Sequence, residues 1–222
     1  MILAIDCSTL WLGIALADEN FLFYEKIWRT SRRHTAELAP AIDQALTETN
    51  KKPDDLKGIA VATGPGSFTS LRIGLAMAKG LALSLALPIY GIPSLDITAA
   101  GIPPSDLPLI CVLEVGRGRL AACRYHYAQP RWEPQGKTIL TSAQELEHTL
   151  THPTLLAGEL GGDDRHVLAR RWRNAVLVRP PHCARRPAFL AEIAMQRAQA
   201  GSADDPATLS PIYLRSIENI LV

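Results

Sequence analysis

The feature that most constrains the fold is a glycine-rich turn placed between a strand and a helix. Residues 64–74 read Gly-Pro-Gly-Ser-Phe-Thr-Ser-Leu-Arg-Ile-Gly, after the short apolar run 58–62 and before a long apolar segment. This order predicts a strand, a turn and a helix over about residues 68–87. Backbone N–H groups converge at the positive end of such a helix, where a phosphate can bind. The Gly-Lys-Ser/Thr of a P-loop does not follow, so the turn predicts only the remnant of an anion site, at Gly64, Gly66 and Ser67.

The composition is that of an ordinary globular protein. The chain has 222 residues, of which 47% are apolar and 20% charged, and its net charge of +1 gives no general attraction to nucleic acid or membrane. Four cysteines lie far apart in the sequence, which favours buried reduced thiols over a disulfide framework or a zinc site. The apolar stretch 80–95 is interrupted by proline and glycine, and no signal peptide is recognisable. We therefore expect a cytoplasmic protein that does not span a membrane.

The hydrophobic pattern predicts two α/β halves separated by a proline-rich break at residues 101–104. Each half begins with antiparallel strands, which fits this pattern better than one doubly wound sheet. In the first half we expect strands at 1–6, 12–17 and 21–28, a helix carrying Leu38, Ile42 and Leu46, a strand at 59–62 and the helix at 68–87. In the second half we expect strands at 109–115 and 120–127, a helix at 142–150, a strand at 155–157, a helix at 163–172, a strand at 175–178 and a helix at 188–200.

A carboxylate ends the first strand and is followed by small hydroxyl residues. Asp6 could hold hydrated Mg²⁺ while Ser8 and Thr9 approach a phosphate. The alternative is that Asp6 and Ser8 only cap a turn. The residue types alone leave both interpretations open.

Four segments resemble the TsaB family, also called YeaZ. They are residues 2–9 (Ile-Leu-Ala-Ile-Asp-Cys-Ser-Thr), 64–74, 78–82 (Ala-Lys-Gly-Leu-Ala) and 211–215 (Pro-Ile-Tyr-Leu-Arg). The family's second-half signature, Asp-Ala-Arg followed by Gly-Glu-Val-Tyr, is replaced here by residues 114–116 and 118–121, and Ser70 stands where a glycine is usual. The resemblance is therefore strong over the first hundred residues and weaker afterwards.

The resemblance implies an ASKHA (actin/Hsp70/sugar-kinase-like) fold with two α/β subdomains, the second reduced. We expect residues 1–100, with the tail from about 203 to 222, to form the first subdomain and residues 101–202 the second. The family takes part in making N6-threonylcarbamoyladenosine at position 37 of tRNAs that read ANN codons. The implied partners are a TsaD-like paralogue that carries out the transfer, a TsaE-like ATPase and, through the complex, tRNA. Alone, the chain is expected to form a homodimer.

The resemblance also implies that this subunit is not itself an enzyme. The two metal-binding histidines of the catalytic paralogue fall on Ser94 and Thr98, whose hydroxyls are poor ligands for Fe²⁺ or Zn²⁺. We expect no cofactor on this chain, the metal lying on TsaD and ATP or ADP being used by the assembled complex. The rival hypothesis is an ASKHA ATPase or phosphotransferase that uses Asp6 and the glycine turn, with residues 158–163 as an adenosine loop. A glycoprotease of the M22 type is more remote, because no nucleophile and base are recognisable.

The family places the contact with TsaD on the two helices of the first half. The second of these is apolar on every side, and Gly74, Ala78 and Ala82 form a ridge of small residues that would let another helix approach. The alternative is that the second half of the chain covers this surface. The predicted interface consists of His34, Leu38, Ile42, Leu46, Leu71, Gly74, Leu75, Ala78, Leu81 and Ala82.

A block of arginines lies in the second half. Seven arginines and no acidic residue occur from Arg165 to Arg186. Such a block can bind tRNA phosphates without sequence preference, or it can be a solvated face. The sequence leaves this choice open.

Overall fold

The computed structural model describes residues 1–31, 33–116 and 118–214, and the chain divides into two compact units. Unit 1 comprises Met1–Ile97 and Arg185–Ile212, and unit 2 comprises Thr98–Ala184 together with Tyr213 and Leu214 of the described tail. This division differs from the expected one. Residues 187–199, expected in the second subdomain, form a helix that packs on the sheet of unit 1. Arg215, the end of the family-like tail motif, lies outside the described residues.

Unit 1 contains a five-stranded sheet in the order β3-β2-β1-β4-β5. Strands β1, β2 and β3 are antiparallel neighbours, whereas β4 and β5 continue the sheet in parallel with β1. The strands are β1 (Ile2–Asp6), β2 (Trp11–Ala17), β3 (Leu22–Arg29), β4 (Gly58–Gly64) and β5 (Ile89–Pro93). The central strands β1 and β4 are buried along their whole length, as expected for strands that helices cover on both faces.

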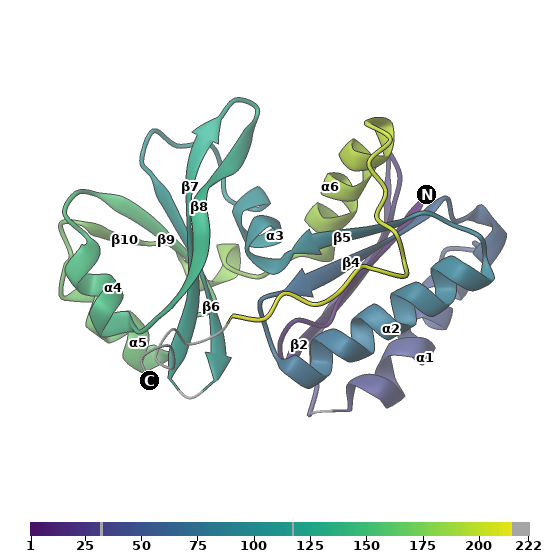
Figure 1. Ribbon diagram of the computed structural model, residues 1–222, viewed down its shortest axis with the longest axis horizontal. Helices are drawn as coiled ribbons and strands as arrows, with labels where there is room; N and C mark the ends of the chain where they lie inside the picture. Colours follow the sequence, from purple (N-terminus) through teal and green to yellow (C-terminus); the bar gives the residue numbers. More distant parts are fainter. Residues whose placement is uncertain (32, 117, 215–222) are drawn as a thin grey trace. The chain divides into compact units, whose positions relative to one another are not determined.

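Helices cover both faces of this sheet (Figure 1). The helices α1 (His34–Glu48) and α2 (Phe68–Ser84) pack on large residues such as Leu3 and Ile5. The helix α6 (Pro187–Gln199) packs on the opposite face. That face is rich in small side chains, which let α6 approach closely: Ala4, Ala15, Ala17, Ala60 and Ala62. The alanine face explains why α6 belongs to unit 1 although it is distant in sequence.

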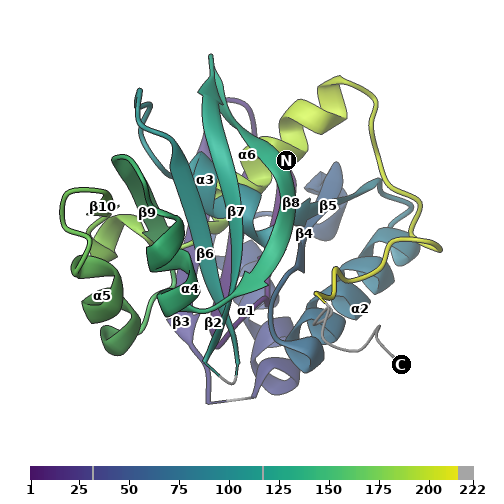
Figure 2. The ribbon, with the colours of Figure 1, turned by 60° about the vertical axis from the view of Figure 1, so that its left-hand side comes forward.

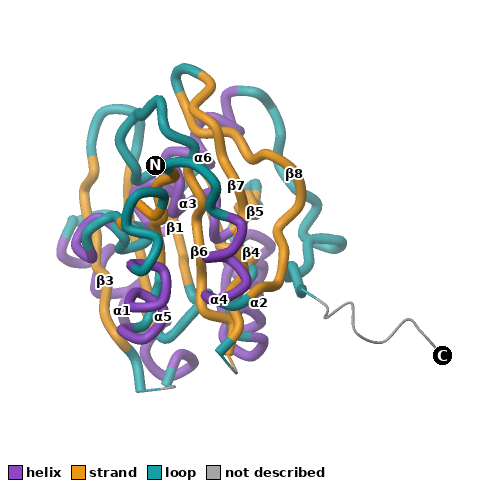
Figure 3. Tube along the Cα trace, turned by 90° about the vertical axis from the view of Figure 1, so that its left-hand side faces the viewer, coloured by secondary structure: helices purple, strands orange, loops and turns teal. Residues whose placement is uncertain are grey.

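Unit 2 contains a second five-stranded sheet, in the order β10-β9-β6-β7-β8. Its strands are β6 (Leu109–Gly116), β7 (Arg119–Ala128), β8 (Arg131–Thr141), β9 (Thr154–Gly158) and β10 (Ala175–Leu177). The helices α4 (Ala143–Thr149) and α5 (Gly162–Ala169) pack on one face of this sheet (Figure 2). The β7–β8 hairpin is long and curved (Figure 3), and its register shifts between Ala122 and Arg124, as a bulge requires.

The two units repeat one topology. In each, three antiparallel strands are followed by a helix, a strand, a helix and a strand, and the first strand lies at the centre of the sheet. The elements of unit 2 are shorter: α5 has 8 residues and α2 has 17, while β10 has 3 residues and β5 has 5. This duplicated arrangement confirms the predicted ASKHA fold with two α/β subdomains, of which the second is reduced.

Several elements differ from the sequence prediction. The strands β5 and β8 and the helix α3 (Ser94–Ala100) were not predicted, and α5 ends at Ala169 instead of 172. Both missed strands contain proline, β5 at its last residue and β8 at Pro134, which argued against a strand assignment. They are edge strands, where one side needs no hydrogen-bond partner. In the three described segments, no helix is long and apolar enough to cross a membrane.

Two glycines of α2 lead to a matched prediction about stability. A Cβ at position 74 would lie 2.9 Å from Cys7 Cβ, whereas a Cβ at position 80 would meet nothing within 4 Å. We expect Gly74→Ala to lower the free energy of unfolding by about 1–2 kcal/mol, because overpacking outweighs the helix propensity of alanine. Gly80→Ala, the control, should raise it by up to about 1 kcal/mol. Urea denaturation of both variants tests this, and a loss of stability in Gly80→Ala would contradict it.

Candidate functional site

The turn between β1 and β2 gathers the polar residues predicted as remnants of a phosphate site. Asp6 ends β1, and its Oδ1 accepts a hydrogen bond of 2.8 Å from the backbone N–H of Ser8. The hydroxyl of Thr9 accepts a bond of 3.2 Å from the N–H of Trp11. Asp6, Ser8 and Thr9 are all buried. Asp6 therefore does cap this turn, as one of the two open interpretations requires.

Asp6 also forms a buried ion pair with Arg185. The Nε of Arg185 lies 2.5 Å from Oδ2 of Asp6, and both side chains are 2% exposed. The same guanidinium donates from Nη2 to the hydroxyl of Thr9 at 3.3 Å. Because the guanidinium compensates the carboxylate charge, a hydrated Mg²⁺ would have to displace a buried cation in order to bind Asp6. The arrangement fits a structural ion pair better than a metal-binding carboxylate.

The glycine turn packs against this β1–β2 turn. The N–H of Ser67 donates to the carbonyl oxygen of Ser8 at 2.7 Å, and a Cβ at position 66 would lie 2.2 Å from that same oxygen. Gly66 is therefore required by the close approach of two backbones. Gly64 adopts a φ of +106°, a conformation that L side chains rarely adopt. Gly64, Gly66 and Ser67, the predicted remnants of an anion site, thus lie against the β1–β2 turn, and the N–H of Ser67 binds protein.

Ser94 and Thr98, the residues expected to stand in place of the paralogue's metal ligands, are buried. The hydroxyls of Ser94 and Ser8 share a hydrogen bond of 2.6 Å, which places the start of α3 against the β1–β2 turn. Thr98, one turn further along α3, is also buried. Among the described residues, no group of three His, Cys, Asp or Glu side chains could hold a metal ion. Ser94 thus belongs to the hydrogen-bonded cluster of Asp6, Ser8 and Arg185.

Cys7 is the remaining reactive group in this cluster. Its side chain is buried against Gly74 of α2. Burial, and secondarily the negative charge of Asp6, raise the pKa of the Cys7 thiol well above its usual value. Because only a thiolate is a good nucleophile or metal ligand, this environment disfavours both roles for Cys7.

The residues predicted to contact a partner are mostly buried in unit 1. His34 donates from Nε2 to the carbonyl oxygen of Thr9 at 2.9 Å, and Ala78 is 0% exposed in the core beneath α2. Of the ten predicted residues, only Leu46 and Leu81 are partly exposed, and the other eight are buried: His34, Leu38, Ile42, Leu71, Gly74, Leu75, Ala78 and Ala82. The ridge of small residues therefore faces its own sheet. This corrects the choice of side chains, whereas the two helices remain the predicted contact.

The sequence analysis did not identify which residues of α2 are exposed to solvent. Phe68, Ala76, Gly80 and Leu83 lie on this face together with Arg72 and Thr69, and Leu83 is 69% exposed. Apolar residues occur on every side of α2 in the sequence. The hydrophobic periodicity therefore could not distinguish the face toward the sheet from the face toward solvent. Arg185 was missed as well, because no local signal links it to Asp6, 179 residues away.

Comparisons with known proteins find relatives whose names refer to tRNA threonylcarbamoyladenosine and its transferase. Residues 28–155 match the family described as TsaD, tRNA N6-adenosine threonylcarbamoyltransferase. The tRNA threonylcarbamoyladenosine biosynthesis protein TsaB of Bacillus subtilis is 35% identical over 160 residues, which cover 71% of this chain and 70% of that protein. A tRNA N6-adenosine threonylcarbamoyltransferase of Thermus thermophilus is 32% identical over 158 residues, 60% of this chain and 49% of the relative. This chain thus spans only about half of that transferase.

A solved structure extends the likeness to nearly the whole chain. YeaZ from Pseudomonas aeruginosa superimposes with a TM-score of 0.79 and covers 96% of this chain and 99% of its own, at 22% identity. At that identity the structure supports the fold alone. The sequence match to the Bacillus protein, together with the match over residues 28–155, shows the family: the chain belongs to the TsaB (YeaZ) family.

Proposed function

We propose that the protein is a non-catalytic subunit in the biosynthesis of tRNA N6-threonylcarbamoyladenosine. Its relative named TsaB is a tRNA threonylcarbamoyladenosine biosynthesis protein, and a second relative is named tRNA N6-adenosine threonylcarbamoyltransferase. In this proposal the chain pairs with a TsaD-like paralogue, which transfers threonylcarbamoyl to A37 of tRNAs reading ANN codons. A TsaE-like ATPase, a homodimer in the absence of TsaD and a cytoplasmic location are further parts of the proposal.

The observation that carries the non-catalytic role is the closed cluster around Asp6. In an ASKHA enzyme, the turns after β1 and β4 would have to offer a carboxylate and backbone N–H groups to a nucleotide. Here Arg185 binds Asp6, and Ser67 donates its N–H to Ser8. Asp6 and at least one backbone N–H of the glycine turn are thus already engaged within unit 1. This argues against the ATPase alternative, because binding would break a buried ion pair.

In this proposal, the chain binds the TsaD-like paralogue through the exposed face of α2. Phe68, Leu83 and Ala76 offer apolar surface, and Ala76 and Gly80 are small enough to let a second helix approach closely. In the complex, a helix of the TsaD-like paralogue would pack on this face. This contact would favour the conformation of the paralogue that binds this subunit. Metal binding and the use of ATP or ADP would then belong to the partners in the assembled complex.

The pairing surface can be tested on α2. Ala76→Arg and Leu83→Glu place charges on the exposed face, and we expect each to weaken pairing with a TsaD-like partner at least tenfold because a buried charge would lack a counter-ion. Thermal unfolding of the variants should change little, since both positions are exposed. Ile139→Glu, an exposed apolar position in β8, is the matched control. Unchanged affinity of Ala76→Arg and Leu83→Glu for the partner by calorimetry would refute this placement.

The ion pair gives a second prediction. Asp6→Ala leaves Arg185 buried without its carboxylate, and we expect the free energy of unfolding to fall by about 3–5 kcal/mol. The double variant Asp6→Leu/Arg185→Met removes both charges and should be more stable than Asp6→Ala. If the subunit is non-catalytic, the folded double variant still supports transfer to tRNA by the partner. Loss of this support in a variant that folds and pairs normally would contradict the proposal.

A further inference from the structure

The arginine block of residues 165–186 does not form one basic patch. Arg185 is buried on Asp6, and Arg186 forms an ion pair with Glu25 of β3. In unit 2, Arg165 donates to the carbonyl oxygen of Val178, and Arg171 pairs with Glu147 of α4 at 3.2 Å. Three of the seven arginines are exposed and have no ion pair within the described part of the chain: Arg170, Arg173 and Arg179. Arg173 directly follows Trp172, and Arg170 lies two residues before it.

The turn that carries them is held firmly in place. It follows α5, and the N–H groups of Asn174 and Ala175 both donate to the carbonyl oxygen of Arg171 at 2.7 Å. The side-chain amide of Asn174 donates to the carbonyl oxygen of Leu150 at 2.9 Å, which fixes the turn to the end of α4. Because the backbone is ordered in advance, a ligand would bind without the entropy cost of ordering a loop.

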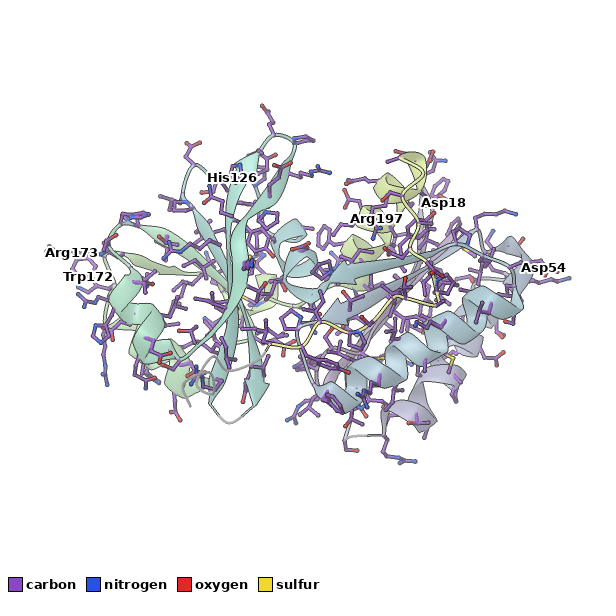
Figure 4. All side chains as sticks on the ribbon, viewed as in Figure 1. Asp18, Asp54, His126, Trp172, Arg173 and Arg197 are labelled. Carbon is purple, nitrogen blue, oxygen red and sulfur yellow. The ribbon has the colours of Figure 1, made fainter. Side chains whose placement is uncertain are left out.

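Trp172 projects from this turn into solvent. Its side chain is 72% exposed, and the guanidinium of Arg173 lies over its ring, 4.9 Å from the centroid. Figure 4 shows the two side chains next to each other, pointing away from the sheet of unit 2. A tryptophan held in water by a rigid turn leaves a large apolar surface unburied. Its surroundings decide which partner would bury it.

The surroundings of Trp172 are basic, not apolar. The other large apolar residues exposed in the described elements of unit 2 include Ile139, which lies in β8 at the opposite edge of the sheet, and Val176 of β10, which is only moderately exposed. A protein hot spot needs an apolar, water-excluding surround, which the turn does not provide. A flat ring flanked by guanidinium groups instead matches an unpaired nucleobase between phosphates: the base stacks on the ring and the arginines bind the backbone.

We propose that the turn from Arg170 to Arg173 is a contact for single-stranded RNA, with a nucleobase stacked on Trp172 and the flanking phosphates bound by Arg170 and Arg173. The stacking platform follows from the geometry of unit 2 alone. That the RNA is a tRNA, with the base in a loop or at the unpaired 3′ end, rests on the proposed function. This contact involves none of the residues of the Asp6 cluster or of α2.

The test measures direct binding of RNA to the full-length chain without any partner. The probes are a labelled, in-vitro-transcribed tRNA and a single-stranded adenosine 20-mer, followed by fluorescence anisotropy at about 50 and 200 mM salt. We expect Trp172→Ala to weaken binding of both probes about tenfold or more, and Trp172→Phe to restore most of it because the ring is kept. Arg170→Gln and Arg173→Gln should each reduce the slope of log K against log salt by about 1.

Matched controls keep the charge and aromatic content comparable. Trp11→Ala removes another exposed tryptophan, in unit 1, and Arg131→Gln removes an exposed arginine of β8, so both should bind RNA as the unchanged protein does. Three results would each overturn the inference: no RNA binding by the unchanged chain at about 50 mM salt, equal binding by Trp172→Ala, or a loss in Trp172→Ala of pairing with a TsaD-like protein instead of RNA. The first two results would not affect the proposed function. If the chain binds RNA as expected but does not increase tRNA modification by its partner, only the proposed function is refuted.

Discussion

The buried ion pair between Asp6 and Arg185 is the interaction on which unit 1 depends. It joins the end of the first strand to the point where the chain returns from unit 2, immediately before α6. The same guanidinium reaches Thr9, whose carbonyl oxygen accepts a hydrogen bond from His34 at the start of α1. Ser8 links the cluster to the glycine turn and to α3. One pair of charges thus fixes the geometry of the turn from which α1, α2, α3 and α6 are positioned.

Much of this fold could be predicted from the sequence, because the pattern of apolar runs and glycine turns is local. The three opening strands, the helices α1 and α2 and the second α/β half follow from that pattern, and the resemblance to TsaB supplies the ASKHA topology. The exact strand content could not be predicted at the sheet edges, where Pro93 and Pro134 are tolerated. The pairing of α6 with the first sheet depends on five alanines in three different strands, and such a surface exists only after folding.

The sequence indicated where the candidate site lies, but not whether the site is open to a phosphate or closed by protein groups. Gly66 and Ser94 both lie against Ser8 in the turn that follows Asp6, since strand ends and the helices that follow them gather at one edge of a sheet. Whether a phosphate site is open or closed depends on a single long-range partner, and Arg185 looked like one member of a basic block. The same limit affected α2. Its apolar content was clear, but burial is set by the sheet beneath it, so Ala78 faces the core while Ala76 faces solvent.

The discontinuity of unit 1 has a consequence for its biosynthesis. When the ribosome is still translating residues 98–184, all five strands of the first sheet have already been made. The helix α6, which covers the alanine face of this sheet, and Arg185, which pairs with Asp6, have not. The missing segment begins at Arg185, so unit 1 is completed only after residues 98–184 of unit 2 have been translated. Closing so long a loop adds entropy cost that the last segment alone must offset. The nascent chain therefore passes through a stage in which unit 1 is incompletely folded. The apolar surface that is exposed at this stage can be bound by chaperones or cleaved by proteases.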